Sequence, residues 1–283
     1  MAGSPAFFIF LMILLGLLIG SFLNVVIYRL PIMMEREWRL QCAELLGNPQ
    51  PDTGSSFNLM TPGSRCPTCD RPIKAYENIP VLSYLFMRGH CACGKTEISL
   101  YYPLVEAFTG MLSGIVAWRF GFGVSTAAAL LLTWALIALS VIDLKKQLLP
   151  DSITLPFLWL GIAFALFGIF TDLQSSVIGA MVGYLSLWSV YQLFRLFTGR
   201  EGMGYGDFKL LAMLGAWQGW QYIVAIVIVS SLVGALIGIT LIVLRGRDRN
   251  IPMPFGPFLA AAGWITLLWG DEINHLYLDW AGL

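Results

Sequence analysis

The chain has 283 residues, of which 57% are hydrophobic and 12% are charged, and its formal net charge is zero. Soluble domains carry about 25% charged residues. The composition therefore excludes an ordinary soluble protein and predicts an all-α, polytopic membrane protein in contact with lipid. The balanced charge gives no sign of nucleic-acid binding, and the sequence does not indicate an oligomeric state.

The first apolar run, residues 6–27, is predicted to be a transmembrane helix. It differs from a signal peptide because no basic segment precedes it, it is longer than a usual signal core, and no A-x-A cleavage site is evident. Arg29 follows the run. Because basic residues favour the cytoplasmic side, we expect the N-terminus outside and the C-terminal end of this helix in the cytoplasm.

Residues 28–100 form a different kind of segment. They hold 15 of the 34 charged residues, half of the prolines and all five cysteines, so we interpret them as an aqueous insertion. We therefore divide the chain into a first helix (1–27), a cytoplasmic insertion (28–100) and a multi-helix membrane domain (101–283). The apolar runs of that domain predict helices at 101–119, 124–142, 153–170, 175–197, 208–220, 222–244 and 254–270.

These runs predict about eight transmembrane helices in all, or seven if the short 208–220 segment does not span. If they alternate across the membrane, Arg119 is the one basic residue that falls outside. This distribution agrees with the preference of Lys and Arg for cytoplasmic loops. The insertion, the loop after Asp143 and the stretch GMGYGDFK (202–209) are then all cytoplasmic.

Two aspartates, Asp143 and Asp207, lie at the ends of apolar runs on this predicted cytoplasmic face. Paired carboxylates can hydrolyse a peptide bond without metal, because mutual repulsion leaves one ionised as a base and the other protonated as an acid. Gly204 and Gly206 precede Asp207 and would let the backbone bend and approach a substrate closely. The pattern predicts an aspartic protease site at the membrane edge.

Two other interpretations of this stretch exist. Both aspartates would also suit ordinary helix ends, where Asp207 would favour the start of the following helix. A phosphate-binding loop is disfavoured, since the spacing is G-x-G-x-G rather than G-x-G-x-x-G and no strand precedes it. Spacing alone does not decide between a catalytic and a capping role.

Four cysteines form two close pairs, Cys66 with Cys69 and Cys91 with Cys93. Four thiolates suit tetrahedral zinc, and disulfides are rare in the cytoplasm, so we predict a structural Zn²⁺ site in the insertion. The alternative is a set of unrelated buried or redox-active thiols. Cys42 has no partner in this pattern.

Several stretches together resemble one known family. Gly204-Tyr205-Gly206-Asp207 matches the GxGD motif of intramembrane aspartyl proteases, and the chain resembles the bacterial type IV prepilin peptidases nearly from end to end. Besides the paired cysteines, the stretches that carry the resemblance are GSFLNVVIYRLP (20–31), YYPLVEAFTG (101–110), DLKKQLLPD (143–151), GMGYGDFKLLAMLGAW (202–217) and PFGPFLA (254–260).

The resemblance implies a bifunctional enzyme of the bacterial inner membrane with a periplasmic N-terminus. It would cleave the leader peptides of type IV prepilins and type II secretion pseudopilins with Asp143 and Asp207, and then methylate the new N-terminus with S-adenosylmethionine. Which residues bind that cofactor is not readable from the sequence. The family's second cysteine pair is usually C-x-x-C, whereas here it is C-x-C, so His90 is an alternative fourth ligand.

Two alternatives to the bifunctional enzyme remain. A leader peptidase without the methyl-transfer step would account for the altered cysteine pair. A transporter or scaffold with a zinc-bound docking loop is a different class, but charges spread through several spans would be expected and only Glu106 lies inside one.

Several other polar residues allow a structural or a functional interpretation. Asp151 suits a helix start. Lys209 is interpreted as a lysine that extends its amine to the interface, with substrate steering or an effect on Asp207 as the alternative. Glu106 would pair with a basic residue of the insertion or contact the amine of the substrate. Gly20, Ser21 and Asn24 would mediate helix packing or line a substrate groove.

The stretch Pro254-Phe255-Gly256-Pro257 opens the last apolar run. Helix initiation explains it. The alternative is that its free carbonyls pair with an extended peptide.

Overall fold

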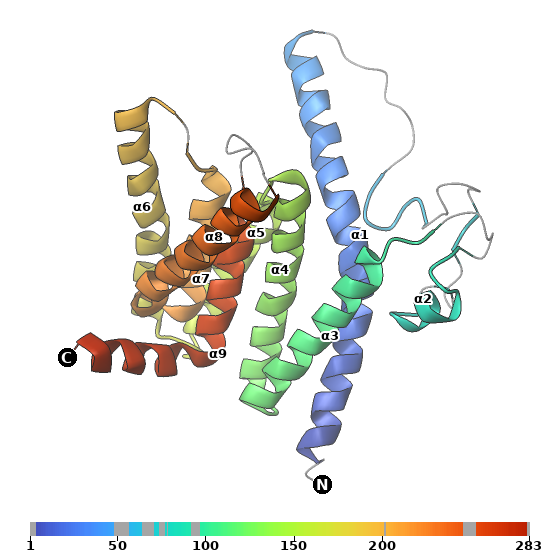
Figure 1. The fold of residues 1–283 in the computed structure, drawn as a ribbon, viewed down its shortest axis with the longest axis horizontal. Coiled ribbons are helices and arrows are strands. Elements are labelled where there is room, and N and C mark those ends of the chain that lie inside the picture. Colours follow the sequence, from blue (N-terminus) through green and yellow to red (C-terminus); the bar gives the residue numbers. More distant parts are fainter. Residues whose placement is uncertain are drawn as a thin grey trace. The chain divides into compact units, whose positions relative to one another are not determined.

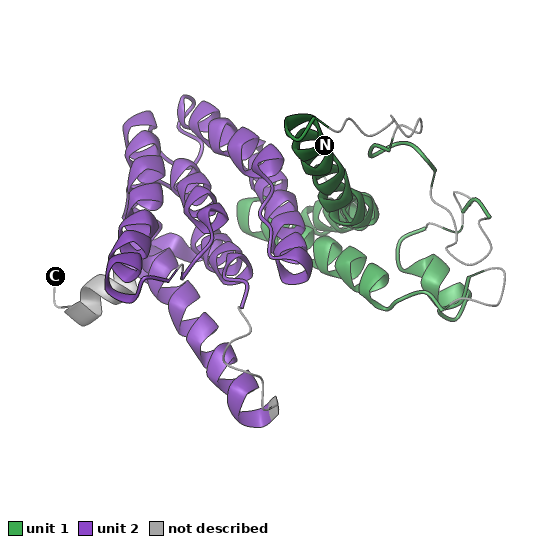
Figure 2. Ribbon diagram, turned by 90° about the horizontal axis from the view of Figure 1, so that it is seen from above, with its two compact units in different colours: residues 1–122 green, residues 123–283 purple. Residues whose placement is uncertain are grey.

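The computed structural model describes residues 4–47, 57–63, 71–73, 77, 79–91, 97–200, 202–245 and 253–281 (Figure 1). The described residues are overwhelmingly helical, as the composition predicts, and they include one isolated β-bridge. The chain divides into two compact units, residues 1–122 and 123–283, which Figure 2 colours separately. Each unit is described by itself below.

The first unit is built on the packing of α1 (Pro5–Leu45) against α3 (Tyr101–Phe120), with the short α2 (Leu82–Phe86) between them in sequence. Glycines allow the close approach of the two long helices. A Cβ at Gly20 would lie 2.7 Å from the Cα of Glu106, and a Cβ at Gly110 would lie 3.0 Å from Leu17. The packing interpretation of Gly20 therefore agrees with its position.

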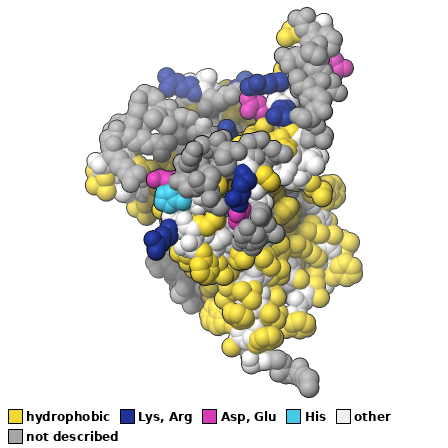
Figure 3. All heavy atoms as spheres, turned by 90° about the vertical axis from the view of Figure 1, so that its right-hand side faces the viewer, with side chains coloured by type: hydrophobic (Ala, Val, Ile, Leu, Met, Phe, Trp, Pro, Cys, Tyr) yellow, Lys and Arg dark blue, Asp and Glu magenta, His cyan; other side chains and the backbone are white. Residues whose placement is uncertain are grey.

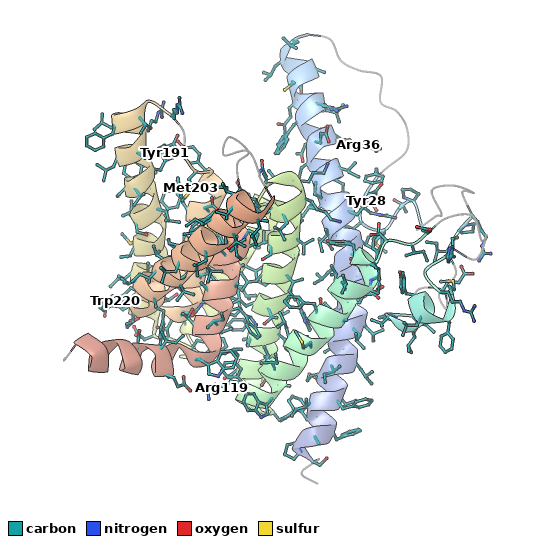
Figure 4. The ribbon with its side chains drawn as sticks, viewed as in Figure 1. Tyr28, Arg36, Arg119, Tyr191, Met203 and Trp220 are labelled. Carbon is teal, nitrogen blue, oxygen red and sulfur yellow. The ribbon has the colours of Figure 1, made fainter. Side chains whose placement is uncertain are left out.

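The predicted end of the first helix at Ile27 is wrong, because α1 continues to Leu45. At 1.5 Å per residue its 41 residues extend about 60 Å, roughly twice the hydrocarbon thickness of a bilayer. Tyr28 and Arg36, labelled in Figure 4, lie in this extension. The apolar run ends before Arg29, but the helix continues through Arg29 and accommodates Pro31 in its interior.

Arg29 is buried and its charge is satisfied by backbone carbonyls. Its guanidinium donates to the carbonyl oxygens of Asn58, Leu59 and Pro62 at 3.0, 3.3 and 2.6 Å. The extended helix is thereby tied to the 57–63 segment.

The second unit contains six α-helices among its described residues, and α7 is the most buried of them. Its helices are α4 (Val124–Lys146), α5 (Asp151–Ala165), α6 (Leu173–Thr198), α7 (Tyr205–Gln218), α8 (Ile223–Arg245) and α9 (Gly256–Ala281). Every residue of α7 from Leu210 to Gln218 is buried. A helix that is apolar around its whole circumference is expected to be enclosed in this way, and α5, α6 and α9 pack around it.

Polar side chains near the C-terminal end of α7 bond to the backbones of its neighbours. Trp217 Nε1 donates to the carbonyl of Phe157 in α5 at 2.7 Å. Gln218 Nε2 donates to the carbonyl of Gly263 in α9 at 2.9 Å. Because these donors are buried, each bond avoids an unsatisfied polar group.

The helices predicted after residue 100 all form, as α3 to α9, and most ends differ by no more than five residues. The exception is α9, which continues past 270 to Ala281 across a kink at Trp269. The prediction of eight membrane spans is only partly supported. Four of the described helices are long and apolar enough to cross a membrane, at Pro5–Leu45, Val124–Lys146, Leu173–Thr198 and Trp220–Leu244.

The surface of the described residues separates by polarity. On the face drawn in Figure 3, charged side chains gather toward one end beside the histidine, and hydrophobic side chains cover most of the rest. Large apolar side chains such as Leu18 and Phe22 on α1 are more than half exposed, at 61% and 52%. Exposed apolar area of this extent agrees with a membrane protein.

We predict that Gly179→Ala destabilises the second unit. Gly179 of α6 faces Gly215 of α7, and a Cβ would overlap the backbone carbonyl of Gly215. Overpacking of this kind typically costs about 1–3 kcal/mol, so the unfolding temperature in detergent should fall by several degrees.

The matched control is Gly238→Ala in α8. A Cβ there makes an ordinary contact, at 3.4 Å from the Met253 methyl group, so the melting temperature should hold or rise slightly. Equal stability of the two variants would contradict the close packing of α6 on α7.

Candidate active site

Asp143 lies in the last turns of α4 and is held by the start of α9. Its side chain is buried, with 5% of the residue exposed, and its Oδ2 accepts a hydrogen bond from the Gly256 N–H at 3.0 Å. Gly256 is the first residue of α9. The first amides of a helix have no intrahelical acceptor and carry partial positive charge, so they favour a carboxylate.

Helix α4 ends at Lys146 with a left-handed residue, Gln147, whose N–H donates to the carbonyl of Asp143 at 2.8 Å. A short connection follows, and the next helix, α5, begins at Asp151. The carboxyl group of Asp143 consequently lies at the end of the helix bundle rather than within it.

Asp207 lies in the first turn of α7 and is also buried, with 7% of the residue exposed. The Asp207 N–H donates to the carbonyl of Gly204, the residue that precedes the helix, at 3.2 Å. The Asp143 carboxylate is thus oriented by a backbone amide at the start of α9. The Asp207 carboxylate lies in the first turn of α7, where the free amides of the helix start favour negative charge without a full positive charge.

The two carboxylates are close enough for Asp143 to perturb Asp207 electrostatically. Two buried carboxylates that repel each other favour a state in which one of them holds a proton, and such a pair titrates as a unit. One ionised and one protonated carboxyl group can serve as base and acid for a water molecule and a carbonyl. The catalytic pairing of these two residues stays a prediction.

Leu149 contacts the two glycines beside this carboxylate pair. A Cβ at Gly206 would lie 2.8 Å from Leu149 Cβ, and a Cβ at Gly256 would lie 2.6 Å from Asp143 Oδ2 and 3.2 Å from Leu149. Gly204, in contrast, faces open space. The close approach at Gly206 is thus to the chain's own Leu149.

Lys209 is paired with Asp151. Its Nζ lies 2.8 Å from Asp151 Oδ1 and 2.6 Å from Oδ2. Asp151 opens α5 without capping it through its side chain. This ion pair joins the first turns of α5 and α7. The Lys209 amine therefore binds Asp151 and not Asp207.

An aromatic cluster covers the first turn of α7. The rings of Tyr205 and Phe208 lie 5.4 Å apart, and Tyr191 of α6 lies 5.4 Å from Tyr205 and 5.6 Å from Phe208. Figure 4 labels Tyr191 on α6 and Met203 in the turn before α7. Aromatic contacts of this kind restrict the orientation of the turn that carries Asp207.

Three of the four predicted zinc ligands, Cys66, Cys69 and Cys93, lie outside the described residues. Cys91 is described and partly exposed. In the described ranges, no group of three or more His, Cys, Asp or Glu side chains could hold a metal ion. The alternative ligand His90 contacts the Arg88 carbonyl through Nδ1 at 2.8 Å.

Two residues near the aspartates were not predicted, Leu149 and the amide of Gly256. The signal for Gly256 was present in the Pro254–Pro257 stretch, because a glycine followed by proline at a helix start leaves a free amide there. For Leu149 no signal exists, since an apolar residue in a short connection is unremarkable without knowledge of its neighbours.

The chain matches known protein families in both parts. Residues 14–120 match the Bacterial Peptidase A24 N-terminal domain, and residues 130–239 match the Type IV leader peptidase family. With the helical fold and the aspartate pair at helix ends, these matches define a membrane peptidase. The chain belongs to the type IV leader peptidase family.

Similar proteins carry one shared name. The chain is 55% identical over 283 residues to the prepilin leader peptidase/N-methyltransferase of Stutzerimonas stutzeri, covering all of this chain and 98% of that protein. It is 54% identical over 283 residues to that of Pseudomonas aeruginosa, covering 97% of it. For the Neisseria gonorrhoeae protein the identity is 50% over 260 residues, covering 92% of this chain and 90% of the relative. No solved structure matches.

We predict that Gly206→Ala lowers peptidase activity at least tenfold, because the new methyl group must displace Leu149 or the turn that carries Asp207. Gly204→Ala is the control, since its Cβ meets no atom within 4 Å. Initial cleavage rates of the two purified variants provide the measurement. Equal rates would show that the contact between Gly206 and Leu149 does not position the carboxylate.

Proposed function

We propose that the chain cleaves the leader peptides of type IV prepilins and type II secretion pseudopilins, and then methylates the new N-terminal amine with S-adenosylmethionine as donor. The observation that supports cleavage is the pair of buried, interacting carboxylates of Asp143 and Asp207. Support for the methylation step comes from the shared name of the relatives.

In the proposed cleavage, the ionised carboxylate accepts a proton from water while the protonated one donates to the carbonyl oxygen of the scissile bond. The hydrogen bond from Gly256 holds the Asp143 carboxyl group in place during the proton transfers, and the enclosed helix α7 holds that of Asp207. Collapse of the tetrahedral intermediate returns a proton to the leaving amine, which becomes the substrate of the second step.

The proposed location is the bacterial inner membrane, with about eight spans, a periplasmic N-terminus and the aspartates at the cytoplasmic edge. The distribution of Lys and Arg supports this orientation. A prepilin inserted in the same membrane would then present its leader on the side where the carboxylates lie. The transporter or scaffold alternative is disfavoured by membership of a peptidase family.

We further propose that Cys66, Cys69, Cys91 and Cys93 bind one structural Zn²⁺. Four thiolates are a suitable donor set for zinc. The described residues that flank the second pair support a closed loop, because His90 bridges to Glu97 and the Ile98 N–H donates to the Gly89 carbonyl at 2.6 Å. Zinc would stabilise an insertion that has few buried apolar residues.

Mass spectrometry of a prepilin incubated with the purified protein tests the proposed function. With S-adenosylmethionine, we expect loss of the leader and a gain of about 14 Da, the mass that one methyl group adds in place of hydrogen. Asp143→Asn and Asp207→Asn should each lower cleavage at least a thousandfold, since an amide cannot take part in the proton transfers.

Asp172→Asn is the matched control, because Asp172 caps α6 at the Ser175 N–H and asparagine caps equally well. Cleavage that survives either catalytic substitution would overturn the aspartic mechanism. Cleavage without methylation by the wild type would identify a leader peptidase alone.

Zinc content provides a separate prediction. Atomic emission spectroscopy should find about one zinc ion per wild-type chain, and Cys66→Ser combined with Cys69→Ser should remove it. Cys42→Ser is the control, because Cys42 is exposed on α1. A double variant with wild-type zinc content would contradict the four-cysteine site.

A further inference from the structure

The first unit contains a buried carboxylate that the cleavage reaction does not use. Glu106 of α3 is 8% exposed. Its Oε2 accepts a hydrogen bond from the Val81 N–H at 2.8 Å, and the side chains of Ser21 and Asn24 lie near it. All three groups are neutral. Among the described residues no lysine, arginine or histidine forms an ion pair with Glu106.

Asn24 beside it has an unsatisfied oxygen. The residue is 7% exposed, and its Nδ2 donates to the Tyr102 carbonyl at 3.1 Å. Its Oδ1 is buried without a hydrogen-bond partner in the described structure. A buried carbonyl oxygen without a donor is costly and rare, and it usually indicates a role. A carboxylate and a free carbonyl oxygen together can accept hydrogen bonds from a cationic group with several N–H donors.

The backbone that reaches Glu106 is strained. Val81 has φ 60°, a left-handed conformation that a β-branched residue rarely adopts. This conformation accompanies the bond from its N–H to Glu106. Strain of this kind concentrates at functional sites.

We propose that Ser21, Asn24 and Glu106 form a site for a primary ammonium group, namely the α-amine that leader cleavage leaves on the mature pilin. This inference rests on the proposed function and adds residues for its second step. The Glu106 carboxylate and Asn24 Oδ1 accept hydrogen bonds from the ammonium group, and the Ser21 hydroxyl and Val81 N–H orient the carboxylate.

The site also accounts for the proton that must leave before methylation. Glu106 accepts one proton from the ammonium group, which frees the lone pair on nitrogen. The nitrogen then forms its bond to the methyl carbon of S-adenosylmethionine, while the carbon–sulfur bond breaks and its electron pair remains on sulfur. The products are a methylated ammonium group, a neutral thioether and a protonated Glu106.

Peptide binding without S-adenosylmethionine tests the amine site directly. The probes are two labelled peptides with the N-terminal sequence of a mature type IV pilin, one with a free α-amine and one N-acetylated. We expect the wild-type protein in detergent to bind the free amine at least tenfold more tightly, and Glu106→Gln to bind both equally. Glu35→Gln, which removes an exposed carboxylate of α1, should retain the wild-type preference.

Kinetics on a full prepilin separate this inference from the proposed function. Glu106→Gln should cleave the leader at the wild-type rate and methylate the product at least tenfold more slowly. A wild-type protein that neither cleaves nor methylates would refute the proposed function itself. A Glu106→Gln variant with normal methylation and amine preference would leave Glu106 as a helix-packing residue and overturn the inference.

Asn24→Leu is a second variant in case Glu106→Gln fails to fold. Leucine is close in size to asparagine, and the substitution removes the unsatisfied Oδ1 together with the donor to the Tyr102 carbonyl. The protein should therefore stay folded with a modestly lower melting temperature, while the amine preference falls severalfold. A purely structural role for the cluster predicts that amine preference is independent of both substitutions.

Discussion

Helix α7 is buried on nearly all sides, and its position determines where Asp207 lies. Gly179 and Gly183 of α6 allow the backbone of α7 to approach closely, because a side chain at either position would overlap the α7 backbone. Trp217 and Gln218 bind α7 to the neighbouring helices through buried hydrogen bonds. A rigid, enclosed helix of this kind supports a catalytic group at its first turn more precisely than a loop would.

Backbone amides provide polar contacts for two of the three buried carboxylates discussed above, and the third lies in the first turn of a helix. Gly256 donates to Asp143, Val81 donates to Glu106, and Asp207 lies at the start of α7, where the helix amides have no intrahelical acceptor. A full positive charge would hold a carboxylate permanently ionised, whereas an amide satisfies it and still allows it to gain a proton. A hydrogen bond from a neutral amide therefore suits a carboxylate that must exchange protons better than an ion pair does. The paired cation Lys209, in contrast, binds the exposed Asp151.

The two units have different chemistry that agrees with two successive steps. The second unit holds the carboxylate pair, which suits hydrolysis of a peptide bond. The first unit holds a single carboxylate beside an unsatisfied amide oxygen, an arrangement that suits an amine. The proposed reaction order follows, since the amine exists only after the peptide bond is cut.

The sequence by itself determined the helices and singled out the two aspartates that we propose as the catalytic pair. Apolar runs long enough to cross a membrane must form helices, because no other structure satisfies a single segment's backbone in lipid. For that reason α4, α6 and α8 were predicted within a few residues, whereas α3, α5 and α7 were predicted from apolar runs that do not meet this criterion. Asp143 and Asp207 were recognisable because aspartates are scarce in such runs, and because GxGD is a specific motif.

Only the tertiary structure decided which groups surround those residues. The extension of α1 to Leu45 depends on carbonyls at Asn58, Leu59 and Pro62 that satisfy Arg29 from a distant segment. The contact of Leu149 with Gly206, the pairing of Lys209 with Asp151, and the environment of Glu106 likewise join residues far apart in sequence. The local sequence pattern gives the hydropathy and the backbone preference of each segment. These contacts form only when the helices pack, and hydropathy does not specify which residues of different helices meet.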